Sequence, residues 1–393
     1  MKRLLGLTSL LAALSASAQA GDYLYVWGME TRDASRPIPP AEAMGRDFLA
    51  VFDVRPSPKD FGKLIAMLPV GTKAQMAHHT DYEMPADGRL FASDYMAGES
   101  YVFDLTEPAR PRLVADFSSA GPYTHPHSFA RLPDGNTLAT YQFKGQPDVA
   151  AGALAELDPT GKLLRAADAS DASDGFIRPY SLVAVPALDR IVTTSAPMMP
   201  TDKSSHVIQV WRLSDLKLIK SIILPRPARF ADAIARNSYE PRLLEDGKTV
   251  LVLTSGCGLY EVTDLAGGNP DARFVYDFGD RACGVPVVAG RYWIQPTSGH
   301  SIVSVDVGDL RRVKEVGRVA LDPDSLPHWV SKEPAGNRLV ITGFGSLSTH
   351  ALFAKVDLKT GALALDSREI DFDRQWPDGW KGPAMPHGAL FSR

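Results

Sequence analysis

A short unit that starts with a histidine and soon reaches a turn recurs at distant places in this chain. In sequence order, the unit starts at His78-His79, Pro126-His127, Pro327-His328 and Pro386-His387. A turn signal rich in glycine, aspartate or asparagine follows the first three starts. A fold that arranges such copies around an axis brings these histidines together. The repeat therefore constrains the fold more strongly than the composition does.

Runs of β-branched and aromatic residues predict six consecutive units of four short strands each. The units are predicted at residues 78–117, 127–167, 180–224, 239–278, 283–320 and 328–366. A four-strand unit at this period is typical of a β-propeller blade. Blades stack around a central channel because a single blade cannot bury both of its faces.

Strands outside the six units predict how the ring closes. Residues 22–27, 48–53 and 63–68 are predicted strands without an innermost partner, whereas residues 386–391 are a predicted innermost strand without a blade. We therefore predict a composite seventh blade that joins the two ends of the chain. The expected fold class is all-β, a seven-bladed β-propeller, with residues 21–393 as a single domain. Surface loops are expected at residues 28–47, 168–176, 197–205 and 225–238.

The first twenty residues have the pattern of an export signal. Met1-Lys2-Arg3 precedes an apolar run at residues 4–14, and Ala18-Gln19-Ala20 supplies small residues for cleavage. We predict a signal peptide at residues 1–20, cleaved after Ala20, and a periplasmic protein; an uncleaved anchor fits the small-residue site less well. No later stretch approaches the length of a membrane span, and the net charge of −4 disfavours a nucleic-acid partner. Neither a membrane nor a nucleic acid is expected as a partner.

Cys257 and Cys283 are the two cysteines of the chain. In an oxidising compartment they can form one disulfide, because adjacent blades can bring them close enough. Two free buried thiols are an equal alternative, in which Cys283 faces the channel as a soft neighbour of a metal.

Aligning the predicted blades by their first turn places one residue of each innermost strand at the same height in the channel. These residues are His79, His127, Tyr180, Tyr239, Cys283, His328 and His387, with His78 beside His79. Neutral imidazole is the commonest protein ligand for copper, zinc and non-haem iron. The histidine set therefore predicts a metal site, and the alternative is that the imidazoles bond only to water and to one another.

Other side chains near this level have open assignments. His125 points to the same face as His127 and is an extra ligand or, as we favour, a rim residue. Glu240 is a ligand, a general base or the salt-bridge partner of Arg242. Met76 and Met84 are soft copper ligands or, as we favour, packing residues. Histidines expected in or before third strands, away from the axis, are His206, His300 and His350.

Four segments resemble the selenium-binding protein family, whose members include methanethiol oxidases. They are His78-His79, Thr124-His125-Pro126-His127, Glu240-Pro241-Arg242-Leu243 and Gly382-Pro383-Ala384-Met385-Pro386-His387. The resemblance extends over most of the chain after residue 20, with low identity between the motifs. This chain lacks the Cys-rich segment that members often carry after the histidine pair and that has been linked to selenium.

The resemblance implies a seven-bladed propeller with copper bound by channel histidines. It also implies oxidation of methanethiol by oxygen and water to formaldehyde, hydrogen peroxide and hydrogen sulfide. The metal ligands implied are His78, His79, His127 and His387, with Glu240 as the channel carboxylate. His328 is added to the ligand candidates by the repeat alone, and Glu240 and His79 are the candidate catalytic residues.

Three functions fit the sequence to different degrees. The first is a periplasmic, copper-dependent oxidase of a small thiol with oxygen as acceptor, for which a copper chaperone is a candidate partner. The second is a non-enzymatic propeller that binds a metal or another ligand. The third is a zinc- or calcium-dependent hydrolase of the lactonase type, which needs several Asp, Glu and Asn side chains in the channel. The excess of histidine over carboxylate at this level disfavours the third function, and the histidine set, the export signal and the resemblance favour the first.

Overall fold

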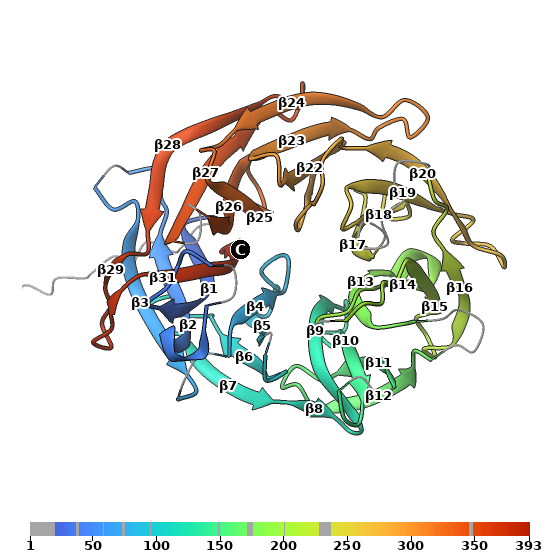
Figure 1. Ribbon diagram of the computed structural model, residues 1–393, viewed down its shortest axis with the longest axis horizontal. Coiled ribbons are helices and arrows are strands. Elements are labelled where there is room, and N and C mark those ends of the chain that lie inside the picture. The colour runs from blue at the N-terminus through green and yellow to red at the C-terminus, as the bar shows by residue number, and fades with distance from the viewer. Residues whose placement is uncertain are drawn as a thin grey trace, which may run out of the picture.

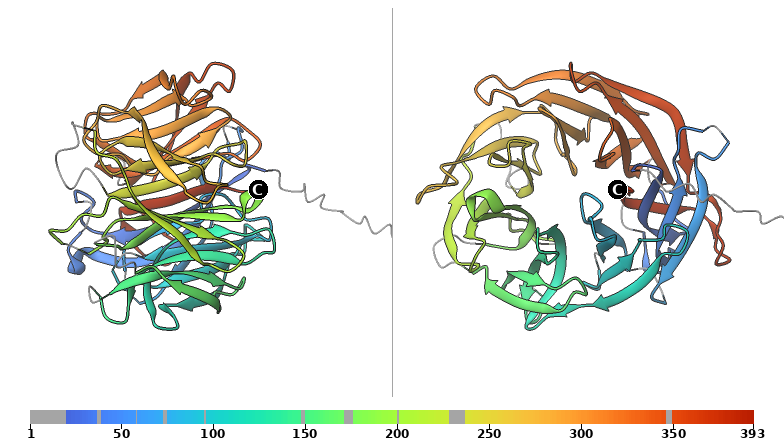
Figure 2. Two further views of the ribbon diagram at one scale, coloured as in Figure 1. Left: turned by 90° about the vertical axis from the view of Figure 1, so that its right-hand side faces the viewer. Right: turned by 180° about the vertical axis from the view of Figure 1, so that it is seen from behind.

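The computed structural model describes residues 20–36, 39–57, 59–72, 75–94, 96–147, 150–170, 176–199, 201–227, 237–345 and 349–393. Seven antiparallel sheets of four principal strands surround a central channel, so the prediction of a seven-bladed propeller is confirmed (Figures 1 and 2). Residues 1–19 of the predicted signal peptide lie outside the described residues. In the part that is described, no helix has the length and apolar character needed to cross a membrane.

Each blade contributes one strand to the channel wall and three strands outside it. The innermost strands, from blade one to blade seven, are β4 (Ala77–Thr80), β9 (Tyr123–Arg131), β13 (Pro179–Val185), β17 (Ser238–Leu243), β21 (Val287–Ala289), β25 (Ser325–Lys332) and β31 (Ala384–Phe391). The second strands are β5 (Arg89–Asp94), β10 (Thr137–Lys144), β14 (Arg190–Ser195), β18 (Val250–Thr254), β22 (Tyr292–Thr297), β26 (Arg338–Gly345) and β1 (Tyr23–Thr31).

The outer strands complete the blades in the same order. The third strands are β6 (Ser100–Asp104), β11 (Ala151–Leu157), β15 (Val207–Arg212), β19 (Gly258–Thr263), β23 (Ser301–Asp306), β27 (His350–Val356) and β2 (Met44–Asp53). The fourth strands are β7 (Arg112–Phe117), β12 (Leu163–Asp168), β16 (Leu218–Ile223), β20 (Asp271–Asp277), β24 (Lys314–Ala320), β28 (Leu363–Asp371) and β3 (Lys63–Val70). Short additions are β8 (Ser119–Ala120), the hairpin β29 (Arg374–Gln375) and β30 (Lys381–Gly382), and the 3-10 turns η1 (Ala41–Ala43) and η2 (Pro186–Leu188).

The composite blade closes the ring as predicted. Strand β31 pairs antiparallel with β1, with Leu24 opposite Phe391, and Figure 1 shows β31 beside β1 with the C-terminus near the channel. The backbone N–H of Gly21 donates to the carbonyl of Ser392 at 2.8 Å, which continues the ladder beyond the strand ends. Apolar side chains fill the spaces between neighbouring blades, as in the cluster of Phe48, Trp329, Trp376 and others.

Blade five departs from the prediction at its inner edge. The expected innermost strand at residues 283–288 is reduced to β21, because Val285 pairs with the neighbouring blade. The N–H of Val285 donates to the carbonyl of His328 at 2.6 Å, and the N–H of Val330 donates to the carbonyl of Val285 at 3.1 Å. Pro286 has no N–H with which to continue the ladder. Gly284 permits the approach, since a Cβ atom there would lie 2.2 Å from the carbonyl oxygen of His328.

Two smaller differences concern loops. Strands β1 and β2 extend further than expected, so the two ends of the predicted loop at residues 28–47 are sheet. The loops predicted at residues 168–176, 197–205 and 225–238 are described only in part, because residues 171–175, 200 and 228–236 lie outside the described residues.

Candidate metal centre

The innermost strands of six blades carry an irregularity at the level of the predicted site. Their pairing with the second strand slips there, so that each holds one residue more than its partner. The slips fall at His78-His79, His127-Ser128, Tyr180-Ser181, Tyr239-Glu240, His328 and His387. A bulge bends the strand and re-aims its side chains. The bulges therefore explain how neighbouring residues of one strand can both belong to the site.

The first histidine pair shows the effect most clearly. Adjacent residues of a regular strand point to opposite faces, but the rings of His78 and His79 stack with centroids 4.3 Å apart and planes inclined by 24°. His127 joins them from β9, with its Nε2 atom 3.2 Å from Nε2 of His78. One ring nitrogen from each of the three histidines lies within 4.8 Å of the other two. This histidine triad, His78, His79 and His127, is the core of the candidate centre.

The other two predicted ligands extend the cluster to one side. The ring centroid of His387 lies 4.6 Å from that of His78 and 5.8 Å from that of His79. The ring of His328 lies 4.9 Å from that of His387. The structure therefore places His387 beside the histidine triad, and His328 beyond it along the channel.

Burial keeps these imidazoles neutral. Removal from water is the main cause that lowers the pKa of His127 to about 3, that of His328 to about 4 and those of His78, His79 and His387 well below the ordinary value. Repulsion between neighbouring imidazolium charges adds to the effect at His78, His79 and His387. Neutral imidazole is the form that binds a metal.

Ser128 contacts two of the triad histidines. Its Oγ atom lies 2.8 Å from Nδ1 of His127 and 3.3 Å from Nδ1 of His79, and 3.2 Å from the hydroxyl of Tyr82. The Tyr82 hydroxyl in turn donates to Oε2 of Glu240 at 2.8 Å. We call the connected groups Ser128, Tyr82 and Glu240 the hydroxyl chain.

The end of the hydroxyl chain sets the direction of its hydrogen bonds. An ionised carboxylate only accepts, so Tyr82 donates to Glu240 and its oxygen accepts from Ser128. The oxygen of Ser128 is then left to accept from Nδ1–H of both His79 and His127. This assignment leaves the Nε2 lone pair of His79 for a metal, and it makes Nε2 of His127 the acceptor in its 3.2 Å contact with Nε2 of His78. The buried Nε2 atom of His79 indeed has no hydrogen-bond partner among the described residues.

Glu240 is held in a fully buried position at the far end of the chain. Its Oε2 atom also accepts hydrogen bonds from Nη1 of Arg242 at 2.9 Å and from the hydroxyl of Ser181 at 3.1 Å. Burial raises the pKa of Glu240, and the Arg242 guanidinium opposes that shift. Glu240 therefore forms the predicted salt bridge with Arg242 and is also connected to the histidines through the hydroxyl chain, while its role as a ligand or general base stays a prediction.

Aromatic rings enclose the centre. Tyr180 lies against His127 with centroids 3.8 Å apart, and Tyr239 stacks on Tyr180 at 4.4 Å. Trp329 lies 5.4 Å from His79 and stacks on Tyr82. A wall of this kind excludes water and strengthens the electrostatic interactions inside it.

The remaining candidates lie elsewhere. His125 packs against Phe143 with centroids 5.1 Å apart, outside the cluster, which agrees with a place at the rim. Met76 and Met84 belong to the apolar core between blades. Contacts away from the channel involve His206 with Arg226, His300 with the carbonyl of Ser325, and His350 with Glu369 and Asp371.

Sequence reasoning missed Ser128, Ser181 and Tyr82. An alignment that assigns one channel residue to each blade discards the neighbour that a bulge also turns inward. The available signal was the double histidine itself, since two adjacent ligands cannot both face the channel from a regular strand.

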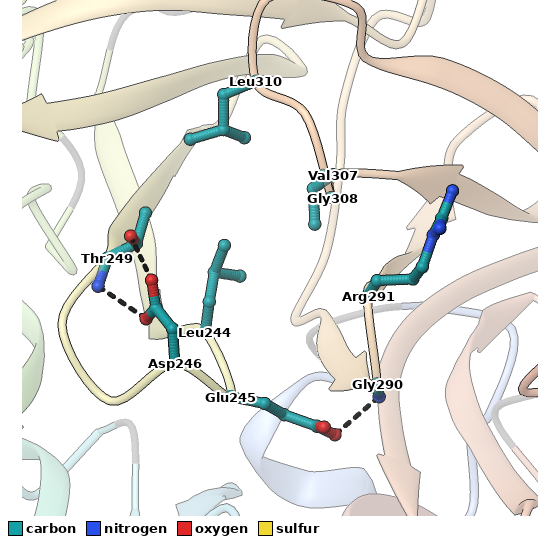
Figure 3. A pocket seen from close by; sticks show the side chains of 9 residues that line it. All are labelled: Leu244, Glu245, Asp246, Thr249, Gly290, Arg291, Val307, Gly308 and Leu310. Atoms are coloured by element: carbon teal, nitrogen blue, oxygen red, sulfur yellow. Dashed lines mark hydrogen bonds between the residues drawn. The ribbon is translucent and has the colours of Figure 1, made fainter.

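The structure joins Cys257 and Cys283 in a disulfide with Cα atoms 5.2 Å apart, so Cys283 is not a free thiol beside the metal. Cys283 lines a pocket of about 290 Å³ together with Tyr239 and His328. A second pocket of about 390 Å³ lies between the β17–β18 and β21–β22 turns and contains none of the candidate residues (Figure 3).

No model of a known protein family matches the chain. The chain is 27% identical over 231 residues to a methanethiol oxidase from Hyphomicrobium sp., a match that covers 52% of this chain. The chain spans about half the length of that curated relative, 48%.

Solved structures share the fold. A hypothetical selenium-binding protein from Sulfolobus tokodaii matches with a TM-score of 0.73 at 16% identity, over 96% of this chain and 94% of that one. A periplasmic gluconolactonase from Pseudomonas aeruginosa matches with a TM-score of 0.63 at 12% identity, over 94% and 99%. At such identities the likeness concerns the fold alone. Together, the match to methanethiol oxidase and the shared propeller support the resemblance to the selenium-binding protein family that the histidine motifs indicate.

Proposed function

We propose that this protein is a copper-dependent oxidase of a small thiol, which converts methanethiol, oxygen and water to formaldehyde, hydrogen sulfide and hydrogen peroxide. The observation that carries the proposal is the convergence of three buried, neutral imidazoles, connected through hydroxyl groups to a buried carboxylate. The similarity to a methanethiol oxidase supports the choice of substrate. A periplasmic location, with the signal peptide removed after Ala20, is part of the proposal.

The donor set fits copper. Imidazole nitrogens are suitable ligands for copper, which stands highest in the affinity order of the divalent metals. His78, His79, His127 and His387 would hold the ion, with His328 next to them. Bound copper would supply coordination of the thiol sulfur and single-electron transfer to oxygen.

The protein's own residues position the ligands and handle protons. Ser128 holds Nδ1 of His79 and His127, which fixes the orientation of both rings. Oxidation of a thiol releases protons, and the hydroxyl chain leads from the imidazoles to Glu240. The Oε1 atom of Glu240 has no hydrogen-bond partner among the described residues and can receive a proton, and the raised pKa of this group favours that.

A lactonase-type hydrolase shares the propeller but needs a different site. Hard cations such as calcium select oxygen ligands. In the described part of the chain, the cluster that meets the geometric requirement of a metal site consists of histidines. The nitrogen-rich donor set therefore favours the oxidase over this alternative.

The experiment is metal analysis and peroxide detection on protein exported to the periplasm. Wild-type protein should contain about one copper per chain and produce peroxide when methanethiol is added. The His79→Ala variant should lose both properties, whereas His350→Ala, a matched change of a histidine far from the channel, should keep both. Full copper content without thiol-dependent peroxide would instead support the non-enzymatic alternative.

A further inference from the structure

The pocket beside His328 lies on the side of the channel that the histidine triad leaves open. Tyr239 from blade four forms one wall, Cys283 and Gly284 from blade five form another, and Leu326 and Pro327 from blade six form the third. His328 belongs to the same lining. The residues at this level thus form a ring around the channel, with the imidazoles on one side and the pocket on the other.

The inner segment of blade five forms part of the pocket wall. Val285 bonds to the backbone of β25 rather than to β22, and Gly284 lies directly against the backbone of His328. The disulfide to Cys257 holds Cys283 in the wall. The pocket is therefore a consequence of how blade five is built.

The dimensions and lining restrict the ligand. A volume of about 290 Å³ lies at the lower end of the range for small-molecule sites, roughly 300–1,000 Å³. Carbon and sulfur atoms make up most of the walls named above, and the described lining contains no charged side chain, since the imidazole of His328 is neutral. Such a site suits an uncharged molecule of few atoms.

The pocket also borders the centre through His328. From His328 the ring of His387 is 4.9 Å away, and from His387 the ring of His78 is 4.6 Å away, measured between centroids. A ligand in the pocket is therefore separated from the histidine cluster by the ring of His328 alone among the contacts named here.

We infer that this pocket binds the small thiol, with its sulfur toward His328 and its alkyl group against Leu326, Pro327 and the Cys257–Cys283 disulfide. The inference rests on the proposed function for the identity of the ligand. It adds the place of binding and a residue, Leu326, that limits the size of the alkyl group.

A blocking variant with a matched control tests the place of binding. Ala282 is an exposed residue at the mouth of this pocket, and Ala335 is an exposed residue in a different surface pocket of about 620 Å³. Binding of methanethiol, and of dimethyl sulfide as a probe that cannot exchange with a disulfide, is measured on metal-free protein by saturation-transfer NMR. Ala282→Leu should weaken binding roughly tenfold or more, and Ala335→Leu should not.

A second variant tests the orientation. Leu326→Ala enlarges the pocket at the proposed alkyl end, so it should raise the affinity for 1-propanethiol relative to methanethiol by roughly tenfold. A change in general stability cannot produce this shift in the relative affinity for the two thiols.

The two proposals fail in different ways. Binding that Ala282→Leu does not weaken, or a thiol preference that Leu326→Ala does not change, overturns the pocket even if wild-type protein oxidises methanethiol. Binding that Ala282→Leu blocks, in a copper-loaded protein that forms no peroxide, supports the pocket and overturns the oxidase.

Discussion

Blade five and the other six blades treat the channel differently. In the six, a bulge turns channel residues inward, and in several a hydroxyl of the second strand fixes the next blade. In each of these bonds a side-chain hydroxyl donates to a backbone carbonyl of the next blade. The bonds are Ser93 to His127, Thr140 to Tyr180, Thr194 to Tyr239, and Thr342 to His387. Blade five also holds one residue more than its partner, between the Cys283–Thr297 bridge and the Val287–Ile294 pair, but there Val285 pairs with Trp329 of blade six, and a disulfide ties the segment to blade four.

The difference separates two tasks. The bulged blades hold imidazoles in fixed positions, which a metal site requires, and Ser128 supports the rings of His79 and His127 from behind. Blade five gives up regular pairing and leaves a small pocket next to that site. Rigidity and access are thus provided by different blades of the same ring.

The largest expected effect on stability is at blade five. Replacing both cysteines, Cys257→Ala with Cys283→Ala, should lower the free energy of unfolding by about 2–4 kcal/mol, because the disulfide restrains the unfolded chain between positions 26 residues apart. Denaturant unfolding of the double variant measures this. Unchanged stability would show that blade five does not depend on the disulfide.

A change behind the imidazoles should act on the metal instead of the fold. Ser128→Ala removes the acceptor of both Nδ1–H groups, so copper affinity should fall about 10- to 100-fold. Competition with a copper chelator gives the affinity. Ser255→Ala also removes a hydroxyl near the channel, but on the blade-five side, and it should leave the copper affinity unchanged within experimental error. Equal losses of copper affinity in both variants would contradict the role of the hydroxyl chain.

The blade-to-blade hydroxyls should each contribute modestly. Thr194→Val keeps the shape of the side chain but removes the 2.6 Å hydrogen bond to the carbonyl of Tyr239, which should cost about 1 kcal/mol of stability. Thr160→Val, at an exposed turn outside the channel, is the control for the substitution itself. A smaller loss in Thr194→Val than in the control would rule out a structural role for this bond.

A further effect concerns acid. Burial lowers the pKa of His328 to about 4, below its ordinary value of 6.5. Between these values the unfolded chain binds more protons than the folded one, so the contribution of His328 to stability is complete above pH 6.5 and is lost as the pH falls toward 4. As the pH falls from 6.5 to 4, the melting temperature of the metal-free wild type should therefore decrease relative to that of His328→Gln. A constant difference would show that His328 does not titrate with a lowered pKa.

Much of the fold was predictable because propeller blades repeat. Strand content, turn signals and the unmatched strands at both ends were sufficient for seven blades and the composite closure. Matched positions in the repeat predicted which residues of the innermost strands lie at the same height in the channel. The structure places the rings of His79, His127 and Tyr180 against one another, as this alignment predicted. Local pairing with a neighbouring blade was not, because the bond between Val285 and His328 depends on tertiary contacts that no pattern along the chain records.

The site was predictable only as far as its imidazoles. Ser128 and Tyr82 are ordinary strand residues in the sequence, and their role depends on a bulge that shifts the register by one residue. Glu240 was predicted because it lies near the channel level at the start of blade four and belongs to a motif of the resembling family. It stands beside Tyr239 in the same arrangement that Ser128 has beside His127. Had this arrangement been applied to every blade, the serine would have been found.

The central claim is that one copper ion is held by channel imidazoles, and spectroscopy of the copper-loaded protein tests it most directly. X-ray absorption and electron paramagnetic resonance should show a single copper site with three or four imidazole nitrogens at about 2.0 Å, lost in His79→Ala. A first shell made mainly of oxygen atoms, or a nitrogen signal that His79→Ala leaves unchanged, would contradict the account.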